Sequence, residues 1–291
     1  MELRVLRYFL AVARTGTLTA AAAQLNVTQP ALSRQLKLLE TELGVQLINR
    51  EHKPVTLTPE GIYLVKQAED MIAIADKTVT NLQSKEAIAG VITIGAAETV
   101  MFDHVIHAIS KLQRNYPNVT ITLISGSTTD LLARLNQGEL DFLFALDFTQ
   151  KASYDYLDFP DADVRGVFIN RHHPLASEPA ITAEQLTQYP VAISRQSSFN
   201  DSLVEELGLK ASQLNIRMKY NLIGNARMYP LVDDQLLLVG IAGVINAPEL
   251  LFKPFTPESI STGTMIWKHT PFLTPLHDEF IHYLENELPI K

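Results

Sequence analysis

Residues 17–40 read TLTAAAAQLNVTQPALSRQLKLLE, the pattern of two helices joined by a tight turn. The alanine-rich start predicts a short helix over about residues 20–25, which either Thr17 or Thr19 can cap with its hydroxyl. Residues 26–27 form the turn. A short helix of small residues lets a neighbouring helix approach closely, so this stretch indicates a compact helical module.

A third helix is expected directly after the turn. Thr28 is placed to cap it, because its hydroxyl can accept a hydrogen bond from a first-turn amide, and Pro30 stands where its missing N–H costs nothing. Gly44 ends the helix. One face is apolar: Leu32, Leu36, Leu39 and Leu43. Other faces are polar: Gln29, Ser33, Arg34 and Lys37. This order of helices is typical of a helix-turn-helix module whose last helix enters a DNA major groove.

The flanking sequence completes the module. Upstream, apolar residues at spacings of three and four predict a helix over about residues 3–14, ended by Gly16. Downstream, residues 45–50 and 55–57 are expected to be two short strands of a wing. Basic residues at its tip can reach phosphate or a narrow minor groove: Arg50, His52 and Lys53. The pattern alone also fits a three-helix module for protein interaction, with a merely solvated polar face.

Five segments carry a family resemblance: residues 17–22 with Leu25, 27–35, 38–40, 43–50 and 57–61. Over roughly its first 65 residues the chain closely resembles the DNA-binding domain of LysR-type transcriptional regulators. The resemblance implies a DNA-facing set that comprises Thr28, Gln29, Pro30, Ser33, Arg34 and Lys37, with Arg50 and Thr56 at the wing, where we add Lys53.

The chemistry of these side chains suggests which of them contact bases and which contact the DNA backbone. Gln29 can bond adenine bidentately, and Arg34 can bond guanine or phosphate. Thr28 and Ser33 are better suited to fixing position on the DNA backbone.

A long helix follows the wing. Residues 58–60 read Thr-Pro-Glu, which supplies a cap, a first-turn proline and an acidic residue at the positive helix end. No breaker appears between Gly61 and Gly90, so about 28 residues form a rod of about 42 Å. Its apolar residues have coiled-coil spacing: Val65, Ala68, Ile72, Ala75, Val79 and Leu82.

This apolar stripe can pack on the chain's own C-terminal domain. The resemblance instead favours self-pairing into a homodimer, with recognition helices about 34–36 Å apart, and implies a possible tetramer.

The rest of the chain alternates short strands with helices. Strand near residues 91–94, helix 102–114, strand 119–124, helix 129–137 and strand 140–146 predict a parallel βαβαβ lobe. A second α/β lobe begins near Val164. In the resembling family, a strand at 264–268 and a helix at 274–288 return to the first lobe.

The fold class is therefore α/β, with three segments: a winged helix-turn-helix at 1–58, a linker helix at 59–88 and a two-lobed effector domain at 89–291. Lobe I takes about 89–160 and 265–291, and lobe II about 161–264.

The family's effector domain resembles type II periplasmic binding proteins, in which two lobes clasp a small ligand where strand ends meet helix N-termini. Such termini favour anions. Candidate effector-binding residues lie in four loops: Glu98, Thr99, Ser127, Thr128, Ser194, Arg195 and Asn225. Each loop is also readable as an ordinary cap or turn. Glu98, and residues 233–234 (Asp-Asp) if they face the cleft, argue against a highly anionic ligand.

Composition and charge exclude several classes. The 291 residues contain no cysteine and no apolar run near the ~20 residues of a membrane helix, so we expect a cytoplasmic protein without disulfides. Residues 1–60 hold seven basic and five acidic residues, a net charge of +2, whereas residues 87–291 carry −9. Contact with a polyanion is therefore expected only at the N-terminal end.

Catalytic and metal-binding motifs are not found. The sequence has no G-x-S-x-G, H-E-x-x-H, P-loop or G-x-G-x-x-G pattern, and His104 with His107 lacks a third ligand nearby. We expect no enzyme, no cofactor and no metal site.

The favoured function is a sequence-specific DNA-binding transcriptional regulator of the LysR type that responds to a small-molecule effector. RNA polymerase is a further expected partner. The alternative is a solute-binding or enzymatic α/β protein whose N-terminal module mediates only association.

Overall fold

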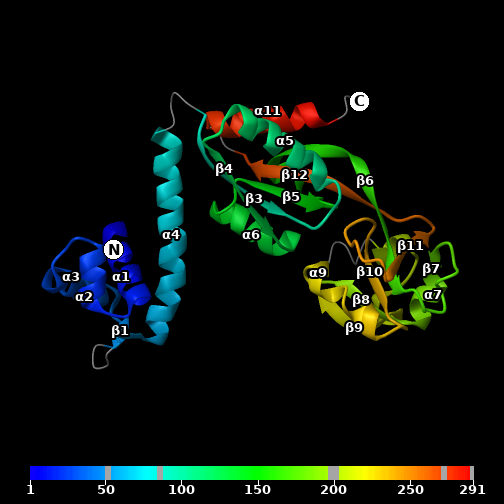
Figure 1. Ribbon diagram of the computed structural model, residues 1–291, viewed down its shortest axis with the longest axis horizontal. Helices are drawn as coiled ribbons and strands as arrows, with labels where there is room; N and C mark the ends of the chain where they lie inside the picture. Colours follow the sequence, from blue (N-terminus) through cyan, green and yellow to red (C-terminus); the bar gives the residue numbers. More distant parts are fainter. Residues whose placement is uncertain (50–53, 84–87, 196–202, 270–273, 289–291) are drawn as a thin grey trace. The chain divides into compact units, whose positions relative to one another are not determined.

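The computed structural model describes residues 1–49, 54–83, 88–195, 203–269 and 274–288. The chain forms two compact units, Met1–Gln83 and Ser84–Lys291 (Figure 1). Each unit has its own hydrophobic core.

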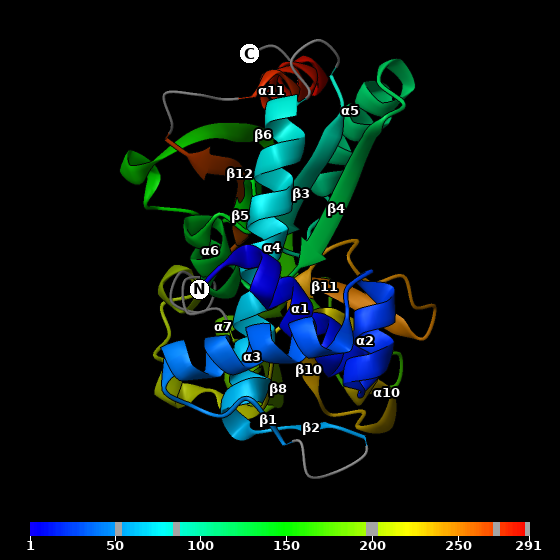
Figure 2. The same ribbon diagram turned by 90° about the vertical axis from the view of Figure 1, so that its left-hand side faces the viewer.

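The N-terminal unit is a helical module with a small wing. Its elements are α1 (Leu3–Thr15), α2 (Leu18–Gln24), α3 (Gln29–Leu43), β1 (Ile48–Asn49), β2 (Thr56–Leu57) and α4 (Pro59–Gln83). The strands β1 and β2 pair antiparallel, which confirms the base of the expected wing. Its tip lies outside the described residues. Figure 2 shows α1 running beside α4, with α2 and α3 in front.

The helix caps follow the sequence with one exception. The Thr17 hydroxyl accepts a hydrogen bond from the Ala20 amide at 3.2 Å, and Asn26 takes the left-handed conformation with φ of 54°. Thr28 occupies the N-cap position of α3, but its side chain makes no capping hydrogen bond, so that prediction was wrong. A cap side chain normally accepts from the second or third helical amide. Because Pro30 is the second helical residue, one of those two donors does not exist.

The apolar stripe of α3 is one residue shorter than expected. Leu32, Leu36 and Leu39 are buried, whereas Leu43 is 38% exposed at the last residue of the helix. At that end, the Glu40 carboxylate accepts hydrogen bonds from the backbone amides of residues 47 and 48 at 3.0 and 3.3 Å. These bonds tie α3 to the wing.

The start of α4 is locked onto the wing. The Thr58 hydroxyl accepts from the Gly61 amide at 3.0 Å and donates to the Gln46 carbonyl at 2.7 Å, which confirms the predicted cap. A Cβ at Gly61 would lie 2.1 Å from the Leu47 carbonyl oxygen. Only glycine allows this close approach.

The apolar stripe of α4 packs within its own unit. Ala68 is buried, and Val65 and Ile72 contact the same core as α1. Arg7 and Arg14 of α1 pair with acidic side chains of α4: Asp76 and Glu69. Part of the stripe therefore packs on α1, a neighbour that the sequence analysis did not consider, and pairing with a partner helix stays a prediction. Exposed apolar side chains remain on α4: Ile62 and Tyr63 near its start, and Met71, Ile74 and Val79 further along.

The first lobe of the C-terminal unit has the predicted βαβαβ order. Its elements are β3 (Gly90–Ala96), α5 (Phe102–Asn115), β4 (Val119–Ser125), α6 (Thr128–Gln137) and β5 (Phe142–Leu146). The strands pair parallel in the order β4-β3-β5. Side chains alternate across β5: Phe142 and Phe144 join the core beneath α5, whereas Leu143 and Ala145 join the core beneath α6. Both faces of this sheet are therefore covered by helices (Figure 1).

The second lobe and the returning segment complete the unit. They comprise η1 (Lys151–Ser153), β6 (Tyr154–Asn170), β7 (Ile181–Thr182), α7 (Ala183–Gln188), β8 (Pro190–Ser194), η2 (Ala211–Gln213), β9 (Asn215–Tyr220), α9 (Ile223–Ala226), α10 (Tyr229–Val232), β10 (Leu237–Ile241), β11 (Leu250–Thr256), β12 (Ile260–Lys268) and α11 (Pro275–Glu287). The strands β10, β8 and β9 pair parallel in that order. As expected, α11 packs on α5 of the first lobe.

Two long strands connect the lobes. The strand β6 pairs with β12 on the first-lobe side, and then with β10 and β11 on the second-lobe side. The prediction began this strand at Val164 and missed its first ten residues, because residues 154–163 mix charged side chains with Pro160 and offer no apolar run. The strand β11 was not predicted either, and it contains Pro254.

A buried arginine lies where the two long strands meet. The Arg165 side chain is fully buried, and its guanidinium donates to the Asp147 carboxylate and, at 3.1 Å, to the Glu206 carboxylate. Asp147 follows β5 of the first lobe, and Glu206 belongs to the second lobe. Asp147 also accepts from the Ser261 hydroxyl at 2.8 Å. The cluster therefore joins both lobes and both crossing strands.

We expect Arg165→Met to destabilise the C-terminal unit by about 3–5 kcal/mol, because it leaves the Asp147 carboxylate without its buried partner. Urea unfolding followed by the fluorescence of Trp267, the single tryptophan, measures this loss. Lys151→Met removes the exposed pair with Asp158 and is the control, with an expected loss below about 1 kcal/mol. Equal losses in the two variants would contradict a structural role for the buried cluster.

Candidate DNA-binding surface and inter-lobe cavity

The first turns of α3 present a polar surface. Thr28, Gln29 and Pro30 are exposed at its start. Arg34 and Lys37 are exposed one and two turns further on, and Ser33 is half-buried. The buried leucines of α3 fix its orientation, so these side chains point away from the core. Among the described residues, neither Arg34 nor Lys37 forms an ion pair, which leaves both cations available for an anionic partner.

Of the three wing candidates, Thr56 lies within the described residues. Thr56 lies on β2 and is exposed, and the Asn49 side-chain amide donates to its hydroxyl at 3.4 Å. The other two wing candidates, Arg50 and Lys53, lie outside the described residues.

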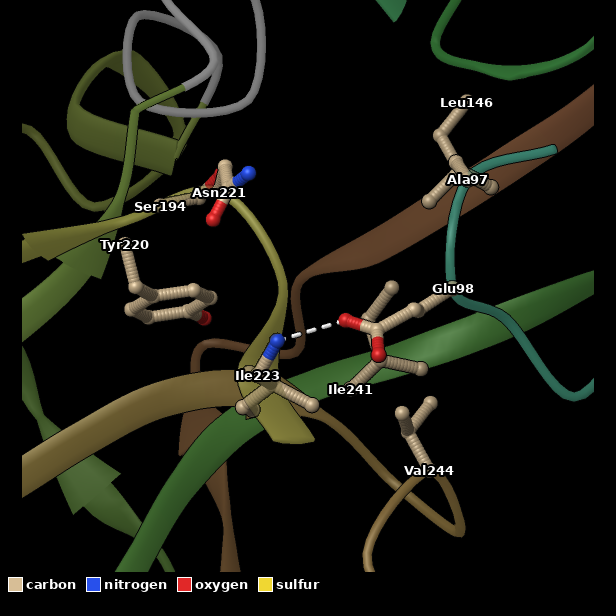
Figure 3. A pocket seen from close by; sticks show the side chains of 10 residues that line it. Ala97, Glu98, Leu146, Ser194, Tyr220, Asn221, Ile223, Ile241 and Val244 are labelled. Atoms are coloured by element: carbon tan, nitrogen blue, oxygen red, sulfur yellow. Dashed lines mark hydrogen bonds between the residues drawn. The ribbon is translucent and has the colours of Figure 1, made fainter. Parts of the chain in front are cut away.

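A small, open cavity lies between the two lobes (Figure 3). The first lobe contributes Ala97, Glu98 and Leu146, and the second lobe contributes Ser194, Tyr220, Asn221, Ile223, Gly240, Ile241 and Val244. The lining residues lie at or just after the carboxyl ends of strands, the position at which open α/β sheets bind ligands.

One hydrogen bond crosses the cavity. The Glu98 carboxylate of the first lobe accepts from the backbone amide of Ile223 in the second lobe at 2.5 Å (Figure 3). This amide begins the short helix α9, where a backbone donor has no intrahelical partner. The protein therefore satisfies that donor with its own side chain.

Tyr220 forms one wall of the cavity. Its hydroxyl donates to the Val239 carbonyl oxygen. Burial, and then the negative charge of Glu98, raise the pKa of the Tyr220 phenol well above its ordinary value. The phenol therefore stays neutral at physiological pH, and its proton is already committed to the backbone.

The cavity brings together two of the seven effector candidates, Glu98 and Ser194. Thr99 instead donates its hydroxyl to Asp163, a buried carboxyl whose pKa is raised by burial. Ser127 caps α6, with its hydroxyl accepting from the Asp130 amide at 3.2 Å.

The remaining three candidates also lie away from the cavity lining. Thr128 is the first residue of α6. Arg195 is exposed, and its backbone amide donates to the Tyr220 carbonyl. Asn225 is exposed on α9.

Sequence reasoning missed most of the apolar lining. The run of residues 216–223 reads in sequence as one strand, whereas β9 ends at Tyr220 and α9 begins at Ile223. The usable signal was polar Asn221 directly after a strand with alternating side chains. The acidic residues 233–234 do not line the cavity. They lie near His173, whose pKa burial lowers.

The histidines singled out in the sequence have local partners. His104 lies 2.7 Å from the Asp161 carboxylate, and His107 lies 3.3 Å from the Asp103 carboxylate. Within the described ranges, no group of three potential metal ligands occurs. No described helix is both long enough and apolar enough to span a membrane.

Comparison with known proteins gives consistent matches to both units. Residues 3–62 match the family described as bacterial regulatory helix-turn-helix protein, lysR family, and residues 85–289 match the LysR substrate binding domain. The chain is 31% identical to the uncharacterized HTH-type transcriptional regulator YbhD of Escherichia coli K12 over 209 residues, which cover 70% of this chain and 65% of YbhD. It is 26% identical to the uncharacterized regulator YybE of Bacillus subtilis 168, with 98% of both chains covered.

The fold is also found among solved structures. The crystal structure of full-length CbnR in complex with its target DNA has a TM-score of 0.73 at 17% identity, and the match covers 99% of this chain and 100% of CbnR. These relatives are regulators, in agreement with the expectation that the chain is not an enzyme. Both matched domains stand in the order that the resemblance implied, and the chain belongs to the LysR family of DNA-binding transcriptional regulators, with an N-terminal helix-turn-helix domain and a C-terminal substrate-binding domain.

Proposed function

We propose that the chain is a cytoplasmic regulator that binds double-stranded DNA sequence-specifically through α3 and responds to a small-molecule effector in the inter-lobe cavity. Its functional segments are the DNA-binding domain at 1–58, the linker helix at 59–88 and the effector domain at 89–291. The observation that carries the proposal is the orientation of α3. Its leucine face is buried, whereas Gln29, Arg34 and Lys37 are exposed on a module that closely follows the helix-turn-helix pattern.

The roles of the individual residues follow from their chemistry. Gln29 and Arg34 read base edges in the major groove, while Thr28, Ser33 and Lys37 contact the DNA backbone beside Pro30. Arg50, Lys53 and Thr56 extend the contact at the wing. The positive charge of the first 60 residues and the negative charge of residues 87–291 support this division, because the C-terminal unit repels DNA.

The effector acts by favouring one arrangement of the two lobes. A ligand changes this equilibrium only if it binds the two arrangements with different affinity. Glu98 and Ile223 are well placed for such discrimination, since they join the lobes across the cavity. The resulting change alters DNA binding or the contact with RNA polymerase.

Self-association is part of the proposal. The exposed apolar residues of α4 are offered to a second copy of the chain: Met71, Ile74 and Val79. A homodimer presents two recognition helices to one face of the DNA, so that two weak contacts act together. Further pairing into a tetramer is compatible with the same arrangement.

We expect Arg34→Ala to weaken binding to a labelled duplex from immediately upstream of the gene by about 1–3 kcal/mol, because it removes a base or phosphate contact. Fluorescence anisotropy at several salt concentrations measures both the affinity and the salt slope. Arg217→Ala is the matched control, since Arg217 is exposed on β9 of the other unit. Equal binding by both variants, or equal affinity for a scrambled duplex, would contradict recognition by α3.

We expect the double variant Ile74→Asp with Val79→Asp to shift the protein from dimer towards monomer, because two carboxylates cannot remain charged in an apolar interface. Sedimentation velocity measures the oligomeric state. Ala73→Asp introduces a carboxylate on a different exposed face of α4 and should leave the dimer intact. A dimer that survives the double variant would place the interface elsewhere.

A further inference from the structure

Helix N-termini alone would make the cavity positive, but the charged side chain in its described lining is acidic. Among its described lining residues, Glu98 has the one charged side chain, and the others are apolar or neutral. Arg195, the one basic residue among the effector-binding candidates, does not belong to this lining. The described part of the cavity wall therefore carries a net negative charge.

The backbone amide that would favour an anion already has a hydrogen-bond partner. The Ile223 amide donates to Glu98, so an anionic ligand would have to displace a carboxylate and then remain beside it. Like charges at such short range repel strongly, and more so in a partly buried site than in water. This arrangement disfavours anions.

Tyr220 adds a second feature that favours positive charge. Its hydroxyl is committed to the Val239 carbonyl, which leaves the aromatic ring as its contribution to the cavity (Figure 3). A cation is attracted to the face of such a ring. Tyr220 and Glu98 both line the cavity, on either side of the Ile223 amide (Figure 3).

The remaining lining sets the size and character of the ligand. Five aliphatic side chains face the cavity: Ala97, Leu146, Ile223, Ile241 and Val244. The cavity is small and open to solvent, so it admits only a compact ligand. The net charge of −9 on residues 87–291 adds a long-range attraction for positively charged ligands.

We propose that the effector is a small organic cation, such as a primary ammonium compound with a compact aliphatic body, whose positive group binds between the Glu98 carboxylate and the Tyr220 ring. This inference rests on the proposed function, since it names the ligand class of the same cavity. Glu98 has further acceptor capacity beyond its bond to Ile223, because a carboxylate has two oxygens with about four lone-pair sites.

The test compares two probes of nearly equal shape and opposite charge, isobutylammonium and isobutyrate. The full-length chain is titrated with each by calorimetry at neutral pH and matched ionic strength. We expect isobutylammonium to bind and isobutyrate to give no measurable binding. Binding of isobutyrate, or failure of isobutylammonium to bind, overturns the proposal without requiring any variant.

Two variants locate the charge that is responsible. Glu98→Gln keeps the size of the side chain and an oxygen acceptor for the Ile223 amide, and we expect it to weaken isobutylammonium binding about tenfold or more. Glu249→Gln removes an exposed carboxylate outside the cavity and should leave the affinity unchanged. Unchanged affinity in Glu98→Gln overturns the assignment.

Binding to the upstream duplex, measured on the same protein samples, separates this inference from the proposed function. If the chain binds DNA but not isobutylammonium, the ligand class is wrong and the regulator stands. If isobutylammonium binds through Glu98 but the chain does not bind DNA, the ligand class is supported and the proposed function fails.

Discussion

The C-terminal unit depends on the burial of one guanidinium at the crossing of two strands. Asp147 and Glu206, which approach the Arg165 guanidinium from different lobes, offset the cost of burying its charge. This requirement holds β6 and β12 together at the point where the chain passes between the lobes. The cavity exists because the lobes are joined at this crossing, so its walls are positioned by residues that never touch a ligand.

In the N-terminal unit, the burial of apolar side chains is the corresponding constraint. Burial of the α3 leucines decides which side of that helix meets solvent, and Glu40 fixes its far end to the wing. Gly61 then allows α4 to begin directly against the wing backbone. A polar recognition surface is thus oriented by its buried side, and the linker helix is oriented by the same small core.

Periodicity along the chain predicted the elements that bury one regular face. The three helices of the first unit and the βαβαβ order of the first lobe were recovered because apolar spacing reports burial directly. The first half of β6 and all of β11 escaped, since their burial depends on neighbours far away in sequence. The cavity shows the same limit: Glu98 was identified from its loop, whereas its bond to Ile223 joins residues 125 positions apart. The α4 stripe was recognised correctly as apolar, but sequence could not decide that α1 covers it.

The central claim is that two copies of α3 enter the major groove on one face of a duplex. Hydroxyl-radical footprinting of the upstream duplex tests it most directly, because it reports which backbone positions the protein covers. We expect two protected patches about 34–36 Å apart, one helical turn of DNA, on the same face. A single patch, uniform protection along the duplex or patches on opposite faces would contradict it.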